Sequence, residues 1–429
     1  IMMWGIENEV YQPASAAAFG KDFQINENTL VSFNSSVAKL AQKEDTTRYI
    51  VQAQIDSSNA NKVCAKWSKN GNVDYTGVNL YVGFKSSVSS ADDEGRKEIT
   101  DTLNRKLNEY KQTYNASSMM ITEYGAGANI NQHATMDENF SWSSDDVSKD
   151  KHYEEYQAFV LETYYSLIQK RKDIPVSFVW NMFDFSCYRN EGGIPRRNTK
   201  GLVCYDHTTK KDAFYFYKAN WNQQDKFVYL TSKRYTERDT KYQQIKVYSN
   251  CEGVELFVNG QSVGKGRKQQ SGVFVWDDVK LDDMNTIKAV GTSDGQTYSD
   301  EVSGIKPENK NSATSIKYQT HIQSIGWQEA KKDGQTSGTI GKGLRMEALK
   351  VKLQNKKYGG NIEYRTHIAQ KGWQDWKKPH DHFYYGEYNS YGAGASPATR
   401  ADFSHQLTDA EAAEYTVERV MKGWEPQTF

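Results

Sequence analysis

The chain has 429 residues, of which 37% are hydrophobic and 13% aromatic, and its 54 Lys and Arg balance 54 Asp and Glu. No apolar run reaches the roughly 20 residues that a membrane-spanning helix needs, and a neutral chain has no basic surface for nucleic acid. The four cysteines form no CxxC pair, so neither a disulfide framework nor a thiolate metal site is indicated. A long, polar and aromatic-rich chain can instead bury several globular cores.

Strand-like and helix-like patterns alternate over the first half of the chain. Short apolar runs predict strands at 1–4, 49–53, 74–81, 119–123 and 176–181. Apolar residues at helical spacing predict helices over 30–40, 99–110 and 153–168. Such alternation indicates a parallel sheet with helices outside it, either a barrel or a doubly wound sheet.

Beyond residue 221 the pattern changes to short β-rich runs. They lie at 227–230, 245–249, 254–258, 273–276 and 286–290. The pair Asn259-Gly260 lies between two of these runs, and a type I′ hairpin turn favours this pair. We therefore expect a small antiparallel sandwich over 225–306, followed by a polar linker at 307–315.

An internal repeat follows the linker. The pattern Tyr-x-Thr-His-Ile-x-x-x-Gly-Trp-Gln begins at Tyr318 and again at Tyr364, an offset of 46 residues (364 − 318). Periods of this length indicate repeated supersecondary units. We assign 316–360 to one unit and 361–429 to a second, divergent one. The tryptophan of each unit is either the core of a small β-module or an exposed ligand contact, and the pattern leaves both readings open.

Two glutamates follow separate predicted strands. Glu9 comes directly after the first strand, and Glu123 ends the strand at 119–123. In a (β/α)8 barrel the C-terminal strand ends meet on one face, so these residues can face each other although they are 114 positions apart (123 − 9). Glycoside hydrolysis needs one carboxyl as acid/base and one as nucleophile or base. Acidic residues at strand ends are also common as solvated loop residues or helix caps, and spacing alone does not decide.

Other polar and aromatic residues near the strand ends could contact a sugar. Trp180 offers a flat apolar face, while Asn79 and Tyr81 could hydrogen-bond to hydroxyl groups, although each of these types is also common in a structural role. His133 lies near the Glu123 motif, but a lone histidine makes no metal site. We find no phosphate-binding loop and no cofactor motif, and the question of a divalent cation stays open.

Five motifs appear in one order along the first half of the chain. They are Trp-Gly-x-x-Asn-Glu at 4–9, Asn-x-Tyr at 79–81, Thr-Glu-Tyr-Gly-Ala-Gly at 122–127, Phe-Val-Trp-Asn-Met-Phe-Asp-Phe at 178–185 and Asn-Thr-Lys-Gly-Leu-Val-Cys-Tyr-Asp at 198–206. In this order they resemble glycoside hydrolase family 2, the β-galactosidase, β-glucuronidase and β-mannosidase family. The resemblance implies that 1–224 is the C-terminal part of a TIM-barrel catalytic domain whose first strands are missing, followed by an immunoglobulin-like sandwich.

The resemblance also implies roles for individual residues. Glu9 matches the acid/base and Glu123 the nucleophile. The substrate-binding positions of the family are matched by Asn8, Asn79, Tyr81, Trp180, Asn198 and Lys200. Two further candidates are His133 and Tyr124. The stretch Asp-Thr-Thr-Arg at 45–48 resembles the family's Asp-Pro-Thr-Arg, which we interpret as structural, with its proline replaced here.

From this resemblance we expect a retaining exo-β-glycosidase that acts on terminal β-galactosides. Glu9 would protonate the glycosidic oxygen while Glu123 attacks the anomeric carbon, with the two carboxyl groups about 5–5.5 Å apart and Trp180 flanking the pocket. One alternative is a β-glucuronidase, since Asn198 and Lys200 could bind a sugar carboxylate. Another is a non-catalytic carbohydrate-binding or cell-wall adhesion protein.

The C-terminal repeat resembles the clostridial hydrophobic repeat with its Gly-Trp signature, which is found on secreted and surface proteins of Gram-positive bacteria. It implies a secreted or cell-surface location and contact with a cell wall or glycan in addition to the carbohydrate substrate. The sequence indicates no nucleic-acid partner and no membrane span, and it does not reveal an oligomeric state.

Overall fold

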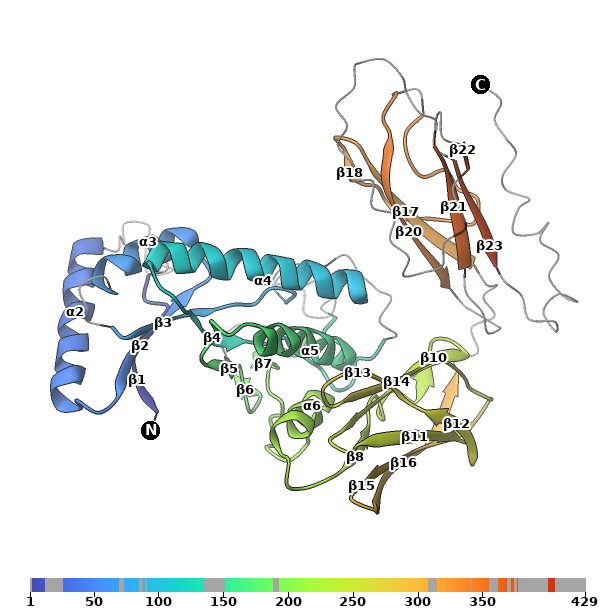
Figure 1. The fold of residues 1–429 in the computed structure, drawn as a ribbon, viewed down its shortest axis with the longest axis horizontal. Helices are drawn as coiled ribbons and strands as arrows, with labels where there is room; N and C mark the ends of the chain where they lie inside the picture. The colour runs from blue at the N-terminus through green and yellow to red at the C-terminus, as the bar shows by residue number, and fades with distance from the viewer. Residues whose placement is uncertain are drawn as a thin grey trace, which may run out of the picture.

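A computed structural model describes the α/β unit, the β-sandwich and the two repeat modules of this chain (Figure 1). The described residues are 2–11, 26–68, 73–84, 88, 91–134, 151–187, 193–307, 315–340, 342–354, 362–368, 372–373, 376 and 400–405. Residues 308–314 of the expected linker and most of 380–429 lie outside them.

The N-terminal unit is built on a five-stranded sheet in the order β1-β2-β3-β4-β5, with all neighbours parallel. The strands are β1 Met3–Asn8, β2 Tyr49–Ile55, β3 Tyr75–Asn79, β4 Met120–Tyr124 and β5 Ser177–Val179. The expected parallel sheet is thus confirmed, with strand bounds shifted by a few residues. A short two-stranded pairing of β6, Phe185–Ser186, with β7, Arg197–Asn198, follows.

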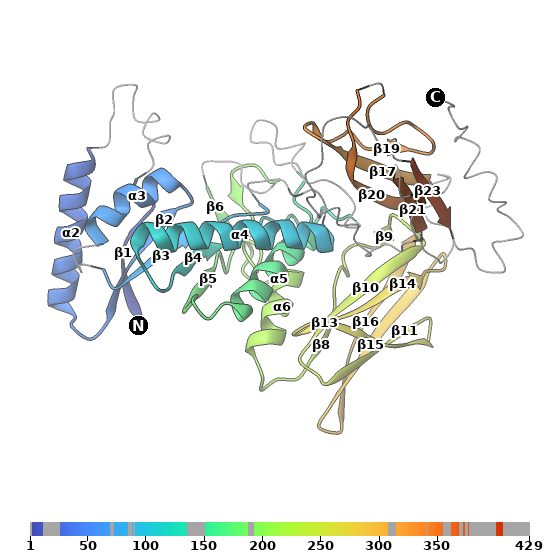
Figure 2. The same ribbon diagram turned by 45° about the horizontal axis from the view of Figure 1, so that its top comes forward.

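Helices connect these strands, and α3, α4 and α5 lie along one side of the sheet (Figures 1 and 2). The helices are α2 Glu27–Glu44, α3 Ser58–Trp67, α4 Asp93–Tyr114, α5 Glu154–Lys170 and α6 Asp212–Trp221. Helices α2, α4 and α5 confirm the periodicity of the sequence, whereas α3 and α6 were not predicted. None of the described helices is long and apolar enough to cross a membrane.

Helix α4 shows why the sequence folds this way. The Asp92 carboxylate accepts hydrogen bonds from the backbone N–H groups of Glu94 and Gly95 and so caps the N-terminus. Asn115 ends the helix with a left-handed φ of 51°. Ile99 and Leu103, four residues apart on one face, are fully buried in the core against the sheet.

A β-sandwich follows α6. One sheet has the order β13-β14-β10-β8 and the other β12-β11-β15-β16-β9. The strands are β8 Val228–Leu230, β9 Glu237–Arg238, β10 Tyr242–Ser249, β11 Gly253–Val258, β12 Gln261–Lys265, β13 Arg267–Gln270, β14 Val273–Lys280, β15 Asn285–Ser293 and β16 Gln296–Pro307. Val247 of the first sheet and Leu256 and Ile287 of the second share one buried core.

The predicted hairpin is present in this sandwich. Val258 of β11 pairs with Gln261 of β12, and the turn residues Asn259 and Gly260 have φ values of 51° and 78°, as a type I′ turn requires. The expectation of a wholly antiparallel sandwich is wrong in one place, because the short β9 pairs with β16 in parallel.

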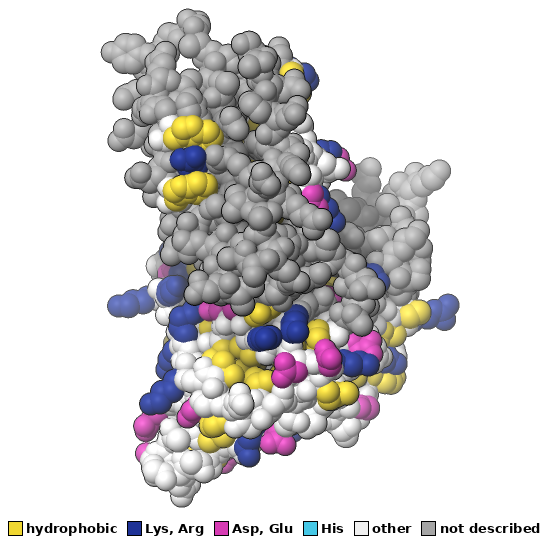
Figure 3. Space-filling view, turned by 90° about the vertical axis from the view of Figure 1, so that its right-hand side faces the viewer, with side chains coloured by type: hydrophobic (Ala, Val, Ile, Leu, Met, Phe, Trp, Pro, Cys, Tyr) yellow, Lys and Arg dark blue, Asp and Glu magenta, His cyan; other side chains and the backbone are white. Residues whose placement is uncertain are grey.

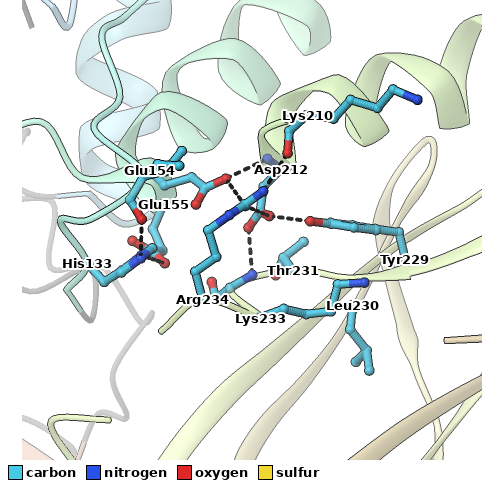
Figure 4. A network of polar contacts seen from close by, with 12 residues as sticks. His133, Glu154, Glu155, Lys210, Asp212, Tyr229, Leu230, Thr231, Lys233 and Arg234 are labelled. Atoms are coloured by element: carbon cyan, nitrogen blue, oxygen red, sulfur yellow. Dashed lines mark hydrogen bonds and ion pairs between the residues drawn. The ribbon is translucent and has the colours of Figure 1, made fainter. Parts of the chain in front are cut away.

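Two buried ion networks join α5 to the sandwich. In the first, Arg234 lies 2.8 Å from the carboxylate of Glu154, whose oxygen also accepts from the backbone N–H of Asp212 (Figure 4). Tyr229 donates to Asp212 at 2.8 Å, and burial raises the pKa of both carboxyl groups. These contacts bind the starts of α5 and α6 to the segment that carries Tyr229 and Arg234.

The second network surrounds Glu162 in the middle of α5. Its carboxylate accepts from Arg96 at 2.7 Å, from Lys246 at 2.8 Å and from the Tyr248 hydroxyl at 2.5 Å. Burial alone would raise the pKa of Glu162, but the two cations outweigh it and hold this pKa below its ordinary value. A buried carboxylate with two cations stays ionised and well bound.

The two repeat modules have matching strand registers. In the first, β17 pairs with β18 so that His321 faces Trp327, and in the second, β21 pairs with β22 so that His367 faces Trp373. A third strand pairs antiparallel with the first in each module. The strands are β17 Ser315–Ile322, β18 Gly326–Trp327, β19 Lys331–Lys332, β20 Met346–Gln354, β21 Ile362–Ile368, β22 Gly372–Trp373 and β23 Arg400–His405.

The tryptophans of the two modules are surface residues. Trp327 is 37% exposed and Trp373 38% exposed, so their interpretation as module cores is wrong and their equivalence is confirmed. The guanidinium of Arg365 lies 4.6 Å from the ring centroids of both Trp373 and Trp376. Figure 3 shows a basic side chain between two hydrophobic ones on the face turned toward the viewer.

Candidate active site

The candidate residues lie at the C-terminal ends of parallel strands, and such ends meet at one edge of a sheet. Asn79, the last residue of β3, pairs in register with Glu123 of β4. Asn8, the last residue of β1, pairs with Ala53 of β2. The sheet thus brings the segments that carry both glutamates to the same edge.

Asn79 links the end of β1 to that of β4. Its amide nitrogen donates to the side-chain oxygen of Asn8 at 3.0 Å and to the carboxylate of Glu9 at 2.9 Å. Its amide oxygen accepts from the Thr122 hydroxyl at 2.7 Å, which fixes which end of the amide faces Glu9. With only 1% of its surface exposed, Asn79 is a rigid donor to the candidate acid/base.

Tyr81 holds the second glutamate. Its hydroxyl donates to the carboxylate of Glu123 at 2.7 Å, a short hydrogen bond of the kind that charged acceptors form. Because Asn79 and Tyr81 are two residues apart, one segment at the end of β3 contacts both glutamates. The Tyr81 hydroxyl thus fixes the orientation of the Glu123 carboxylate.

Glu9 has an unusual backbone conformation. Its φ is +52°, a left-handed value that few non-glycine residues adopt, and its N–H donates to the Ala53 carbonyl at 2.9 Å. Since this residue follows an irregularity in the β1–β2 pairing, the chain turns sharply where the candidate acid/base begins.

Glu7 is a site residue that the sequence reasoning missed. One of its oxygens accepts from the Ala53 backbone N–H at 3.0 Å and from the Gln54 amide at 2.6 Å. Burial raises the pKa of Glu7 to about 8, and the neighbouring Glu9 acts in the same direction. Glu7 lies beyond the strand predicted at 1–4, but β1 runs to Asn8, and a charged residue inside a strand needs a partner.

Trp180 follows β5 and lies beside the loop after Glu123. The backbone N–H of Trp180 donates to the Tyr124 carbonyl at 2.8 Å. Its partly exposed ring meets the Phe185 ring edge-on, with the ring centroids 6.1 Å apart. A Cβ on Gly125 would come within 2.2 Å of the Trp180 carbonyl oxygen. Only glycine therefore allows these two segments to lie so close.

Asn198 and Lys200 lie on a buried loop. The Asn198 side-chain oxygen accepts from the Lys200 backbone N–H at 3.0 Å and so shapes its own loop. The Lys200 side chain is only 2% exposed, and its ammonium lies 4.7 Å from the Phe84 ring centroid and 5.5 Å from that of Tyr81. A positive charge is thus held beside the tyrosine that contacts Glu123.

Lys211 joins three loops of this region by hydrogen bonds, and it was not predicted from the sequence. Fully buried, it donates to the Ala128 carbonyl at 3.0 Å, the Thr199 carbonyl at 2.8 Å and the Asp184 carboxylate at 2.8 Å. Asp184 in turn accepts from the Gly201 N–H at 2.9 Å. The loops that follow Glu123, Trp180 and Asn198 therefore share one buried ion pair.

Two further candidates do not join the glutamates. The His133 ring contacts Glu155 at 3.0 Å and stacks on Tyr235 at 5.6 Å. The Tyr124 side chain is fully buried, and its hydroxyl accepts from that of Tyr217 at 3.0 Å. In these contacts both residues serve the structure around the site.

The stretch 45–48 also has structural contacts. The Asp45 carboxylate accepts from the Thr47 N–H at 2.8 Å and from the Trp4 indole at 2.9 Å. The Thr47 hydroxyl also donates to this carboxylate, and its hydrogen bond contributes most to lowering the pKa of Asp45 to about 2. The segment therefore ties the end of α2 to β1, in agreement with our structural interpretation.

No group of three or more His, Cys, Asp or Glu residues suited to a metal ion occurs within the described ranges. The described residues bring together carboxyl groups with amide, phenol and ammonium partners. Such a set can move protons and stabilise charge at a glycosidic bond.

Comparisons with family descriptions match two parts of the chain. The family described as "Clostridial hydrophobic W" matches residues 321–355, which cover most of the first repeat module. The family described as "Domain of unknown function (DUF4982)" matches residues 241–299 in the sandwich.

Similar sequences cover about 70% of the chain. A β-glucuronidase of Bacteroides fragilis is 32% identical over 303 residues, which are 70% of this chain and 38% of that protein. A putative β-glucuronidase of Formosa agariphila is 26% identical over 330 residues, 70% of this chain and 36% of that protein. The chain thus spans well under half the length of these curated relatives.

Solved structures show the same relationship. A putative β-galactosidase from Bacteroides fragilis matches with a TM-score of 0.56 and 30% identity over 72% of this chain and 41% of its own. An FMN-binding β-glucuronidase from Facaelibacterium prausnitzii matches with a TM-score of 0.54 and 29% identity over 73% of this chain and 42% of its own. The chain therefore has its relatives among β-glucuronidase-like and β-galactosidase-like glycoside hydrolases and resembles about two fifths of their multidomain fold.

Proposed function

We propose that this chain carries the acid/base and the nucleophile of a retaining exo-β-glycosidase. One observation carries the proposal: the segment that ends β3 contacts both glutamates, Glu9 through Asn79 and Glu123 through Tyr81. Two carboxyl groups with different partners at one sheet edge are what double displacement at a sugar requires. The names of the similar proteins support the same reaction class.

The proposed reaction has two steps. In the first, Glu9 donates its proton to the glycosidic oxygen while a Glu123 oxygen attacks the anomeric carbon, so the aglycone leaves as an alcohol and a glycosyl ester forms. In the second, the Glu9 carboxylate takes a proton from water, whose oxygen attacks the same carbon and frees Glu123. We expect the two carboxyl groups to lie about 5–5.5 Å apart, with Trp180 beside the sugar.

The sugar is a terminal β-galactoside in our leading proposal, which rests on the sequence around Lys200 and Lys211. A β-glucuronide is the second candidate. The buried Lys200 ammonium favours it, because a positive charge in a poorly solvated place attracts a sugar carboxylate strongly. A non-catalytic carbohydrate-binding protein is the third reading, and it predicts no turnover at all.

A mechanism-based label tests the nucleophile. A 2-deoxy-2-fluoro glycoside with a good leaving group should glycosylate the protein and be hydrolysed only slowly, and peptide mass spectrometry should find the sugar on Glu123. The Glu123→Gln variant should take up no label, while the control Glu252→Gln, an exposed sandwich residue, should label like the wild type. A label on Glu7 or Glu9 would overturn the assignment.

Matched 4-nitrophenyl galactoside and glucuronide distinguish the two sugars. If the substrate is a glucuronide, Lys200→Met should lower its kcat/KM by roughly 30-fold or more, since removing one partner of a buried charge pair costs about 2–5 kcal/mol. Turnover of the galactoside should then change little. Equal effects of Lys200→Met on both substrates would remove the argument for the acidic sugar.

We further propose that the repeat modules contact a cell-wall glycan and that the protein works outside the cell or on its surface. The exposed Trp327 and Trp373 and the match to the Gly-Trp family support this proposal. The double variant Trp327→Ala, Trp373→Ala should lose co-sedimentation with purified cell walls. The exposed Ile340→Ala in the same region is the control, and retention of binding by the double variant would contradict the proposal.

A further inference from the structure

The pairing of β1 with β2 is irregular just before Glu9. Gly5 pairs with Val51 and the next regular partners are Asn8 and Ala53, so three residues of β1 advance against two of β2 (8 − 5 against 53 − 51). An extra residue of this kind is a β-bulge, which bends the strand and re-aims the side chains that follow.

The Glu7 side chain lies inside this bulge. Both backbone groups of Ala53 are held: its N–H donates to a Glu7 carboxyl oxygen at 3.0 Å, and its carbonyl accepts from the Glu9 N–H at 2.9 Å. A side-chain carboxyl thus takes the place of the backbone acceptor that a regular ladder would offer. The second Glu7 oxygen faces the N–H of Val10 at 3.5 Å, so Glu7 contacts the chain beyond Glu9 as well.

Further contacts fix the Glu7 carboxyl itself. The Gln54 amide donates to the same oxygen as Ala53, at 2.6 Å, and the oxygen of that amide accepts from the Cys64 thiol on α3 at 2.8 Å. This chain of contacts anchors the bulge to the helix layer behind the sheet. The left-handed backbone of Glu9 follows directly after it.

We propose that Glu7 is a positioning residue for the acid/base: its carboxyl group fills the bulge, holds residue 9 in its left-handed conformation and so aims the Glu9 carboxyl at Asn79. This inference rests on the proposed function and adds to it a residue that does not touch the substrate. Fixing a reacting group is worth much, because a misplacement of about 1 Å can lower a rate about 100-fold.

The protonation state of Glu7 makes a conservative variant available. Burial raises the pKa of Glu7 to about 8, so the side chain is neutral at neutral pH. Glutamine is then close to it in shape and charge and keeps an oxygen for the Ala53 N–H. Alanine removes that oxygen and leaves the donor without its partner.

Leaving-group dependence tests the inference in the purified protein. A 2,4-dinitrophenyl glycoside needs no proton to release its phenolate, whereas a 4-methylumbelliferyl glycoside of the same sugar depends more strongly on the acid/base. Glu7→Ala should lower kcat/KM for the umbelliferyl substrate about tenfold or more and for the dinitrophenyl substrate by less than about threefold. Glu7→Gln and the control Glu252→Gln, an exposed sandwich residue, should stay within about threefold on both.

Each other outcome has a definite meaning. An equal loss on both substrates in Glu7→Ala would overturn the positioning role, and so would unchanged rates. If the wild type turned over neither glycoside, the proposed function would fail, and amide exchange would then decide about Glu7. Faster exchange of the Ala53 amide in Glu7→Ala but not in Glu7→Gln would support the bulge contact, and equal exchange would overturn it.

Discussion

The two glutamates lie in unlike places of the same sheet. Glu123 ends β4, which has a strand on each side, and its surrounding loops are fastened by the buried Lys211. Glu9 follows β1, which has one neighbour in the described sheet, and it depends on Asn79, Ala53 and the bulge at Glu7. Packing therefore positions the proposed nucleophile, whereas a few hydrogen bonds position the proposed acid/base.

Removing either carboxyl group should have the largest effects on activity, and these effects should differ between the two glutamates. Glu123→Gln should lower kcat on the order of 10⁵-fold or more for every substrate, because no covalent intermediate can form. Glu9→Gln should lower kcat/KM roughly 10²–10⁴-fold for a methylumbelliferyl glycoside and far less for a dinitrophenyl glycoside. Steady-state kinetics with both substrates measures this, and a uniform loss in Glu9→Gln would contradict its role as acid.

Stability should differ between the two sides. Lys211→Met leaves the Asp184 carboxyl buried without its cation and should lower the free energy of unfolding by about 3–5 kcal/mol. Glu7→Ala leaves one backbone N–H without its partner and should lower it by about 1–3 kcal/mol. Urea denaturation measures both, with Lys288→Met of an exposed ion pair as a control expected near zero. A smaller loss in Lys211→Met than in Glu7→Ala would reverse the comparison.

The acid/base side should also respond to pH. The folded chain keeps the Glu7 proton up to a pKa of about 8, whereas the unfolded chain loses it near the ordinary glutamate pKa of 4.5. The contribution of this group to stability is therefore full below about pH 4.5 and falls as pH rises toward 8, by up to about 1.4 kcal/mol per pH unit. Denaturation of wild type and Glu7→Gln between pH 4 and 9, at steps of about one unit, isolates this slope. Identical pH profiles would show that Glu7 titrates normally.

The smallest effects should come from the residues that hold the carboxyl groups. Tyr81→Phe removes one hydrogen bond to Glu123 and should lower kcat roughly tenfold for all leaving groups. Asn79→Ala should lower activity by a similar factor, but more for poor leaving groups, since it acts through Glu9. In each variant, the ratio of the rate losses on substrates with good and poor leaving groups shows through which glutamate Tyr81 or Asn79 acts. The same leaving-group dependence in both variants would remove that assignment.

The sequence predicted the sheet and the sandwich well because their patterns repeat at short range. It missed α6, Asp212–Trp221, whose run Phe-Tyr-Phe-Tyr favours a strand by propensity. This segment is helical because it packs between α5 and the sandwich, where aromatic residues on several faces are buried. It missed α3, Ser58–Trp67, since small and polar residues such as Ala60 and Asn61 hide its buried face.

The site residues likewise divide into those that short-range patterns indicate and those that depend on long-range contacts. The strand-end rule found Glu9, Glu123, Asn79 and Tyr81, because a parallel sheet gathers strand ends whatever the loops do. It did not find Lys211, whose partner Ala128 is 83 residues away in the chain. Glu7 was missed because its role depends on a register shift that no pattern of residue types records.

The matching registers of the two repeat modules bear on how strongly this chain can hold a surface. His321 faces Trp327 as His367 faces Trp373, so the same ring is presented twice on one polypeptide. Once one ring is bound, the tether sets the effective concentration of the second, at about millimolar for short flexible linkers. Two individually weak contacts can then act as a durable anchor, whose strength is tuned by the number of modules rather than by the affinity of each.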